Sequence, residues 1–151
     1  MHVPFIDLSP TISRVQSNVL KRWENCLTKG EFVGGPTVNA LEEKMAEKLG
    51  VTNFISCSSG TDALVVGLQA MGIKQGMKVA LTNQTFWAPF EAIVQLGATP
   101  ILIDIDPDDL QMSYEAFVKA YDTYKFDGAI MVHMYGWTSA KLKEIRGFCL
   151  K

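Results

Sequence analysis

The chain has 151 residues, of which 48% are hydrophobic and 20% charged, and its formal net charge is −2 at pH 7. This composition is typical of a globular protein with an apolar core, and it gives no electrostatic reason to expect binding to nucleic acid or to an anionic membrane. The apolar runs are too short for a membrane span, and the first residues do not resemble a signal peptide. Three cysteines without metal-binding spacing are most simply free thiols, which indicates a cytoplasmic protein.

The N-terminal part of the chain reads as helix, loop and helix. Apolar residues at helical spacing predict a helix over about residues 9–27. A glycine-rich loop follows at 31–36. A second helix is predicted to start near Pro36, with Thr37 as its N-cap, and Gly50 fits the position just beyond its end.

From residue 53 onward the sequence alternates between short apolar segments and amphipathic segments. The strands are predicted at 53–57, 78–82, 100–104 and 129–133, and the helices after them near residues 60–71, 85–96, 113–121 and 141–151. Strands rich in valine and isoleucine that alternate with helices predict an α/β fold, a three-layer αβα arrangement around a mostly parallel sheet. We expect an N-terminal helical segment, residues 1–35, followed by this domain, residues 36–151.

The last predicted helix is followed by no further strand. Crossover helices in an α/β sheet normally return the chain to the sheet, so this sequence looks like the N-terminal part of a larger protein. The strand edges and helix faces that a missing remainder would leave uncovered favour association or marginal stability.

The turn Ser58-Ser59-Gly60-Thr61-Asp62 lies between the first predicted strand of this alternation and its helix. The first N–H groups of a helix have no partner within the helix, and the helix dipole is positive there. A glycine permits close approach, and serine and threonine add hydroxyl donors, so the turn has the chemistry of a phosphate site. The alternative is an ordinary N-cap, because the same residue types prefer that position.

Three other loops at predicted strand ends carry candidate residues. Phe86 and Trp87 could stack on a planar ligand, although packing of one of them in the core is the commoner arrangement. Asp104 and Asp106 could bind a metal, but a polar turn is the simpler interpretation. His133 is a candidate acid–base group or ring contact, and a structural, hydrogen-bonded histidine is the alternative.

The order of these motifs resembles the N-terminal part of the DegT/DnrJ/EryC1/StrS sugar aminotransferases, which are pyridoxal-phosphate enzymes of aspartate aminotransferase fold type I. The resemblance covers essentially the whole chain. Its motifs are Val3-Pro4-Phe5-Ile6-Asp7-Leu8, Phe32-Val33-Gly34-Gly35-Pro36, Ser58-Ser59-Gly60-Thr61-Asp62-Ala63-Leu64, Thr85-Phe86, Gly97-Ala98-Thr99-Pro100, Asp104-Ile105-Asp106-Pro107 and Val132-His133-Met134-Tyr135-Gly136.

The resemblance implies a role for each matching position. Gly60, Thr61 and Asp62 match the turn that holds the cofactor phosphate. Phe86 matches the aromatic residue that stacks on the pyridine ring, with Trp87 as second choice, and His133 lies near the cofactor. The loop residues Phe32, Gly34, Gly35 and Pro36 match a border of the substrate cleft.

The resemblance also implies what lies outside this chain. The family's catalytic lysine and the acidic partner of the pyridine nitrogen both come after the histidine-tyrosine-glycine stretch, and the lysine is expected beyond Lys151.

The chain is therefore expected to be part of a nucleotide-sugar aminotransferase and to be inactive alone. The whole enzyme would act on a keto-sugar nucleotide and an amino-acid donor, for surface polysaccharide or amino-sugar biosynthesis. The expected partner is a second copy, because family members are homodimers, or a C-terminal chain. The alternative is a non-catalytic truncated domain that binds a phosphorylated ligand or a partner chain. A nucleotide-binding α/β domain is a weaker alternative, because the chain has neither G-x-G-x-x-G nor a Walker loop.

Overall fold

The computed structural model describes residues 4–150. The chain folds into two compact units, residues 1–56 and 57–151. The domain boundary that the sequence suggests, at residue 35, falls between two helices of the first unit and stays a prediction. Within the described residues, no helix has both the length and the apolar character that a membrane span requires.

The first unit contains two helices, α1 (Ser9–Lys29) and α2 (Pro36–Leu49). The helix α2 ends as the sequence predicts, because Gly50 (φ 66°) adopts the left-handed conformation that closes a helix, and Gly30 (φ 69°) closes α1 in the same way. The predicted N-cap of α2 is wrong: Gly35 occupies that position and Pro36 starts the helix. Proline favours this start because its fixed φ suits the first helical turn, where a missing N–H costs nothing.

Residues 53–57 do not form the predicted strand. Ile55, an apolar residue of this segment, is 73% exposed. A strand exists through hydrogen bonds to a neighbour, and the described part of the first unit contains no other strand. The local apolar pattern was therefore insufficient to make this segment a strand.

The second unit contains the sheet and four α-helices. In chain order its elements are α3 (Gly60–Ala70), β1 (Lys78–Thr82), α4 (Trp87–Gln95), β2 (Thr99–Ile103), α5 (Tyr114–Tyr124), β3 (Gly128–Ile130), the 3₁₀ turn η1 (Met134–Gly136) and α6 (Leu142–Cys149). The strands are all parallel and lie in the order β2-β1-β3. This confirms the predicted α/β class, although β3 is shorter than expected because its ladder with β1 spans only three residue pairs.

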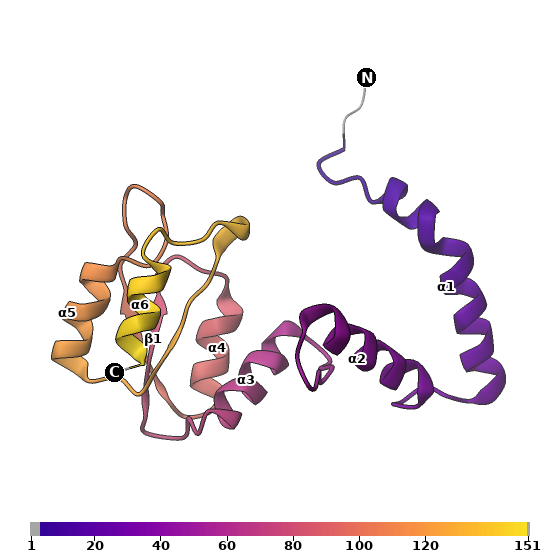
Figure 1. Ribbon diagram of the computed structural model, residues 1–151, viewed down its shortest axis with the longest axis horizontal. Helices are drawn as coiled ribbons and strands as arrows, with labels where there is room; N and C mark the ends of the chain where they lie inside the picture. The colour runs from indigo at the N-terminus through magenta and orange to yellow at the C-terminus, as the bar shows by residue number, and fades with distance from the viewer. Residues whose placement is uncertain (1–3, 151) are drawn as a thin grey trace. The chain divides into compact units, whose positions relative to one another are not determined.

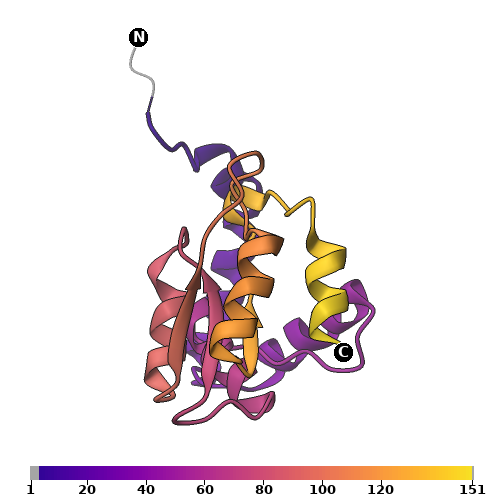
Figure 2. The same ribbon diagram turned by 90° about the vertical axis from the view of Figure 1, so that its left-hand side faces the viewer.

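Alternation along β1 separates two apolar cores. Val79 and Leu81 face a core with α3 and α4, whereas Ala80 faces a second core with α5 and α6, and all three are fully buried. Figures 1 and 2 show α4 on one side of the strands and α5 and α6 on the other. The second unit therefore has the three-layer αβα arrangement.

The connections explain this layering. The chain crosses from β1 through α4 to β2 in one direction along the sheet, then returns through α5 to β3 on the opposite side of β1. Because such parallel crossovers are right-handed, opposite directions place α4 and α5 on opposite faces. The loops after β1 and β3 consequently leave the same edge of the sheet but turn toward different faces. The crevice between two such loops is where α/β proteins bind ligands.

Candidate functional site

The first turn of α3 keeps two backbone donors unpaired. Ser59 is its N-cap, and its Oγ accepts a hydrogen bond from the Asp62 N–H at 3.1 Å, while its carbonyl accepts from the Ala63 N–H at 3.1 Å. Within the described chain, the N–H groups of Gly60 and Thr61 have no acceptor. These two donors, at the positive end of the helix dipole, can bind an anion.

The Asp62 carboxylate organises the hydroxyls of this turn. It accepts hydrogen bonds from Ser58 Oγ and from Ser59 Oγ, the latter at 3.0 Å. These two bonds, with Ser58 the larger cause, lower the pKa of Asp62. Since the Asp62 N–H is already held by Ser59, the free donors of this turn are those of the two residues before it.

The turn is open enough for a phosphate to approach. A methyl group placed on Gly60 would meet nothing within 4 Å, and the residue is exposed. Thr61 beside it is partly buried, and no hydrogen bond engages its hydroxyl within the described chain. Free N–H groups, an uncommitted hydroxyl and open space fit a phosphate group.

Both aromatic residues after β1 lie on the surface. Phe86 is 74% exposed and Trp87 63% exposed, so the interpretation that one of them packs in the core is wrong. Trp87 leans on Phe90 of the same helix, with ring centroids 4.7 Å apart, whereas no aromatic contact engages the ring of Phe86 in the described residues. Phe86 therefore offers a free ring face to a planar ligand.

The carboxyl end of β1 also holds unsatisfied polar atoms. Thr82 Oγ1 and Thr85 Oγ1 are buried and lack a hydrogen-bond partner in the described structure. Buried hydroxyls without partners are uncommon in proteins. These two hydroxyls are therefore available to hydrogen-bond to a group that the chain itself does not supply.

The loop after β2 is a polar turn, as the simpler interpretation predicts. Asp104 Oδ1 accepts a hydrogen bond from Asn83 Nδ2 at 2.7 Å, and Asp106 Oδ1 accepts from the Asp108 N–H at 2.8 Å. Among residues 4–150, no three histidine, cysteine, aspartate or glutamate side chains are grouped as a metal site would require.

His133 follows β3 and is exposed. It precedes the turn η1, in which Tyr135 has a φ of 55° and Gly136 a φ of 82°. A tyrosine in the left-handed region is unusual, and such conformations concentrate at functional sites. The structure thus brings Phe86, Trp87 and His133 to the carboxyl ends of neighbouring strands.

The predicted substrate-cleft residues, Phe32, Gly34, Gly35 and Pro36, belong to the first unit. Phe32 is 70% exposed, and both glycines have positive φ, at 65° and 82°. A shared cleft with the cofactor residues of the second unit stays a prediction.

Sequence reasoning missed two residues that contact the loop carrying His133. Asp109 and Gln111 hydrogen-bond to the loop that follows β3. The sequence offered one sign of a buried amide, because Gln111 lies between the apolar residues Leu110 and Met112. Its hydrogen-bond partners could not be predicted from the sequence.

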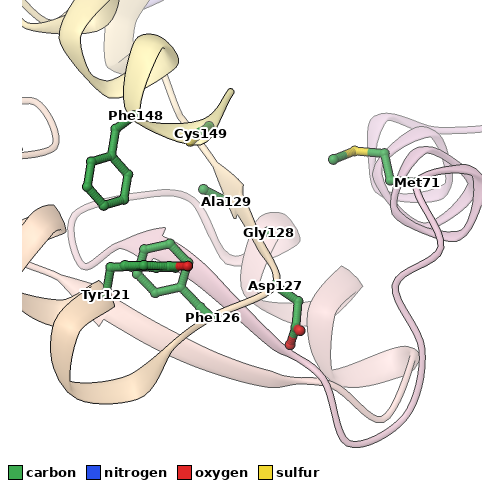
Figure 3. Close-up of a pocket in the computed structure, with 8 residues that line it drawn as sticks. All are labelled: Met71, Tyr121, Phe126, Asp127, Gly128, Ala129, Phe148 and Cys149. Carbon is green, nitrogen blue, oxygen red and sulfur yellow. The ribbon is translucent and has the colours of Figure 1, made fainter. Parts of the chain in front are cut away.

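A separate pocket lies at the open edge of β3. It measures about 400 Å³ and is lined by Met71, Tyr121, Phe126, Asp127, Gly128, Ala129, Phe148 and Cys149. Figure 3 shows the aromatic rings and Met71 on opposite sides of the strand. Burial raises the pKa of the Cys149 thiol. None of the candidate cofactor residues lines this pocket, so it is separate from the candidate phosphate site.

Comparisons with known proteins agree with this geometry. The chain is 34% identical over 134 residues to a UDP-N-acetyl-3-dehydro-α-D-glucosamine 3-aminotransferase from Acidithiobacillus ferrooxidans, covering 89% of this chain and 36% of that protein. It is 32% identical over 134 residues to the UDP-2-acetamido-2-deoxy-3-oxo-D-glucuronate aminotransferase of Pseudomonas aeruginosa, with 89% and 37% covered. The chain thus spans little more than a third of these relatives.

Solved structures show the same correspondence. A DegT DnrJ EryC1 StrS aminotransferase from Brucella abortus superposes with a TM-score of 0.86 at 30% identity, over 99% of this chain and 41% of that one. The ntda protein of Bacillus subtilis, solved with bound cofactor PMP, gives a TM-score of 0.87 at 28% identity, over 98% and 34%. The sequence profile of the DegT/DnrJ/EryC1/StrS aminotransferase family matches residues 13–151. The chain therefore belongs to this family of pyridoxal-phosphate-dependent aminotransferases.

Proposed function

We propose that this chain is the cofactor-phosphate part of a pyridoxal-phosphate-dependent nucleotide-sugar aminotransferase. The observation that carries the proposal is the start of α3, where the N–H groups of Gly60 and Thr61 have no acceptor in the described chain and Gly60 is exposed. A dianionic phosphate there would accept both bonds and interact favourably with the helix dipole. The proposal takes its reaction from the family to which the chain belongs.

The residues of the second unit divide the work of holding the cofactor. Gly60 and Thr61 would bind its phosphate, with Asp62 keeping the serine hydroxyls in place. Phe86 would cover the ring, with Trp87 behind it, and His133 would approach from the loop after β3. Pyridoxal phosphate supplies the electron sink that stabilises negative charge on the carbon losing its proton. Within this chain the residues bind and orient; the catalytic lysine is proposed to lie in sequence that corresponds to the rest of the relatives.

The substrate class follows from the relatives. Both curated relatives reported above are named for oxo or dehydro forms of UDP-linked sugars. We infer a keto-sugar nucleotide as acceptor and an amino acid as donor, with Phe32, Gly34, Gly35 and Pro36 at the border of the cleft.

The open edge of β3 is the proposed surface for the remainder of the fold. One side of β3 pairs with β1, and within the described residues no strand pairs with the other side. The apolar pocket of Figure 3 follows this edge between Met71 and Phe148. The chain spans only 36–41% of three of the relatives reported above. We propose that a strand from the additional sequence of such relatives pairs with this edge, which lies between two layers of helices.

A titration with pyridoxal phosphate tests the function. Saturable binding is expected from the absorbance of the cofactor, without a borohydride-reduced adduct at any unique lysine by intact mass. Pyridoxal, which lacks the phosphate, is expected to bind at least roughly 10- to 100-fold more weakly, since one charge-assisted hydrogen bond alone has that value and the phosphate would accept two. Equal affinity for the two compounds would exclude α3 as the phosphate site.

Thr61→Ala provides the matching variant. It removes the hydroxyl but keeps the N–H, so a several-fold loss of affinity for pyridoxal phosphate is expected. Thr123→Ala is the control, because that exposed hydroxyl bonds only to the Lys119 carbonyl of its own helix, at 3.0 Å. Binding that saturates but supports no transfer, even after the remainder of a family enzyme is added, would favour the non-catalytic alternative.

Light scattering tests the open edge. The isolated chain is expected to associate as concentration rises, because the pocket surface is uncovered. Met71→Lys places a charge in the pocket and is expected to reduce association. Val94→Lys, on an exposed position of α4 (49% exposed), is the control. A monodisperse wild-type monomer at high concentration would contradict the proposed surface.

A further inference from the structure

The loop between β2 and α5 places a buried amide against the turn that carries His133. Gln111 is only 4% exposed. One end of this amide lies 3.1 Å from the carbonyl oxygens of both Val132 and Trp137, and hydrogen bonding assigns the nitrogen, Nε2, to that end. The amide nitrogen has two hydrogens, so it can donate one bond to each carbonyl. The opposite orientation of the amide would leave one long bond, 3.4 Å, to the Asp109 carbonyl and would turn its oxygen toward two other oxygens.

These two carbonyls flank an unusual piece of backbone. Between them, Tyr135 and Gly136 both have positive φ, and only two internal hydrogen bonds close the turn: Gly136 N–H to His133 O and Trp137 N–H to Met134 O, each 3.0 Å. A tyrosine in this conformation requires stabilising contacts from its surroundings. Gln111 bonds to the chain immediately before and after the turn, and so it fixes both ends at once.

Asp109 holds the same loop further along. Its Oδ1 accepts a hydrogen bond from the Gln111 N–H at 2.8 Å, and its Oδ2 accepts from the Ala140 N–H at 2.8 Å. The Asp109 carboxylate therefore joins the loop after β2 directly to the loop after β3. It also orients the backbone of Gln111, whose side-chain amide donates to the turn. The loop after β2 reaches the preceding loop as well, through the bond from Asn83 to Asp104.

We propose that Gln111 and Asp109 are positioning residues of the candidate cofactor site, which hold the turn of residues 133–136, with its left-handed Tyr135 and Gly136, and so fix the place of His133. The inference rests on the proposed function for its consequence, cofactor binding, but the hydrogen bonds that carry it lie within this chain. It gives the loop after β2 a role that neither a metal site nor a plain surface turn would have.

The deciding experiment is amide hydrogen exchange of the full chain without cofactor. Gln111→Met keeps the length of the side chain and removes both donors. The amides of Gly136 and Trp137 are expected to exchange about tenfold faster or more, as for the loss of one or more net hydrogen bonds, while amides of β1 change little. The ring signal of His133 in proton NMR is expected to move toward the position of an unstructured histidine. Asp108→Asn is the control, because its exposed carboxylate accepts no hydrogen bond in the described chain.

Gln111→Glu adds a pH signature that is specific to the bonds donated by the side chain of residue 111. A carboxylate facing two carbonyl oxygens is repelled, whereas a protonated carboxyl can donate one bond. Burial raises the pKa of a carboxyl, so protection of the turn is expected to recover as the pH falls from roughly 7 to 5. The wild type and Gln111→Met are expected to show no such recovery, once exchange is corrected for the intrinsic effect of pH.

The outcomes separate this inference from the proposed function. Wild-type exchange in Gln111→Met, or an equal increase in Asp108→Asn, overturns the positioning role. Failure of the wild type to bind pyridoxal phosphate overturns the proposed function and leaves the exchange result to decide the inference. If the wild type binds, Gln111→Met is expected to bind about tenfold more weakly, in proportion to its loosened turn. Unchanged affinity with a loosened turn overturns the inference.

Discussion

Two polar regions of the second unit use their hydrogen-bonding groups in opposite ways. At the start of α3, the N–H groups of Gly60 and Thr61 have no acceptor among the residues that the structure describes. In the loop after β2, both carboxylate oxygens of Asp109 accept a backbone N–H, and Gln111 bonds to two carbonyls. Both segments are short and polar and contain aspartate, and their sequences alone do not separate them.

The difference identifies what each region does. A segment with surplus donors in open space has capacity for a ligand, whereas a segment whose donors and acceptors are satisfied within the chain stabilises its neighbours. Removing a side chain from the second kind should reduce stability without any ligand present. Removing a donor from the first kind should reduce binding and leave stability almost unchanged.

The largest effect is expected for Asp109→Ala. It leaves the N–H groups of Gln111 and Ala140 without their acceptor, so the free energy of unfolding should fall by about 1–3 kcal/mol. Urea unfolding followed by circular dichroism measures it. Asp109→Asn keeps one acceptor oxygen and should lie between the wild type and alanine. A change below about 0.5 kcal/mol for alanine would mean that this loop is not the saturated region described above.

Gly60→Pro should give the opposite result. Gly60 is the first residue of α3, where proline is favoured, and Ser59 before it is already extended (φ −152°, ψ 166°), as a residue preceding proline prefers. The substitution removes one free N–H, so affinity for pyridoxal phosphate should fall about tenfold while the free energy of unfolding changes by less than about 0.5 kcal/mol.

Gly60→Ala is the control for this variant, because it keeps the N–H and its added methyl group meets no atom within 4 Å. Both variants are compared by fluorescence titration and thermal unfolding. If alanine weakens binding as much as proline does, the backbone donor is not what binds the phosphate.

Ser59→Ala tests the cap of α3. Its Oγ accepts the Asp62 N–H, and loss of such a cap typically costs about 1 kcal/mol of stability. The newly freed N–H adds a third outward donor, so phosphate affinity should not fall with stability. Chemical denaturation and titration of the same sample separate the two quantities. A parallel loss of both would show that the turn needs its cap to bind.

The smallest effect is expected on acidification. The Ser58 and Ser59 hydroxyls lower the pKa of Asp62 in the folded chain. The ionised carboxylate therefore stabilises the fold at any pH above its unfolded-state pKa of about 3.9, and this stabilisation is lost as the pH falls through the lower pKa of the folded state. NMR shifts of the first turn of α3 should therefore change only below about pH 4. Asp62→Asn should remove this local transition, and an Asp62 transition at or above the ordinary value would refute the hydroxyl contacts.

Much of the second unit could be predicted from local sequence. The strands β1 and β2 are apolar runs bounded by turn residues, and the structure places them within one residue of their predicted limits. Ser113 caps α5 as predicted, accepting the Ala116 N–H at 3.2 Å. These features depend on neighbours in sequence, which is why the pattern was sufficient.

Other features depend on distant partners and could not be predicted. Residues 53–57 have a strand-like pattern but no neighbouring strand in the described first unit. Asp109 and Ala140 are 31 positions apart. The candidate cofactor residues came from motif order and resemblance, whereas the exposure of Phe86 and the surplus donors at α3 required the structure.

The position of β1 in the middle of the sheet has a consequence for folding. Its bonds to β3 close a long stretch of chain, as the contact from the Lys78 N–H to Asp127, 49 positions later, illustrates. During synthesis, β1 can pair with β2 well before Gly128–Ile130 has left the ribosome. Until then one side of the central strand is unpaired, and the apolar core on that side is incomplete. Late closure of a nonlocal contact slows folding and prolongs exposure to aggregation, so the yield of folded chain should depend on how quickly translation passes β3.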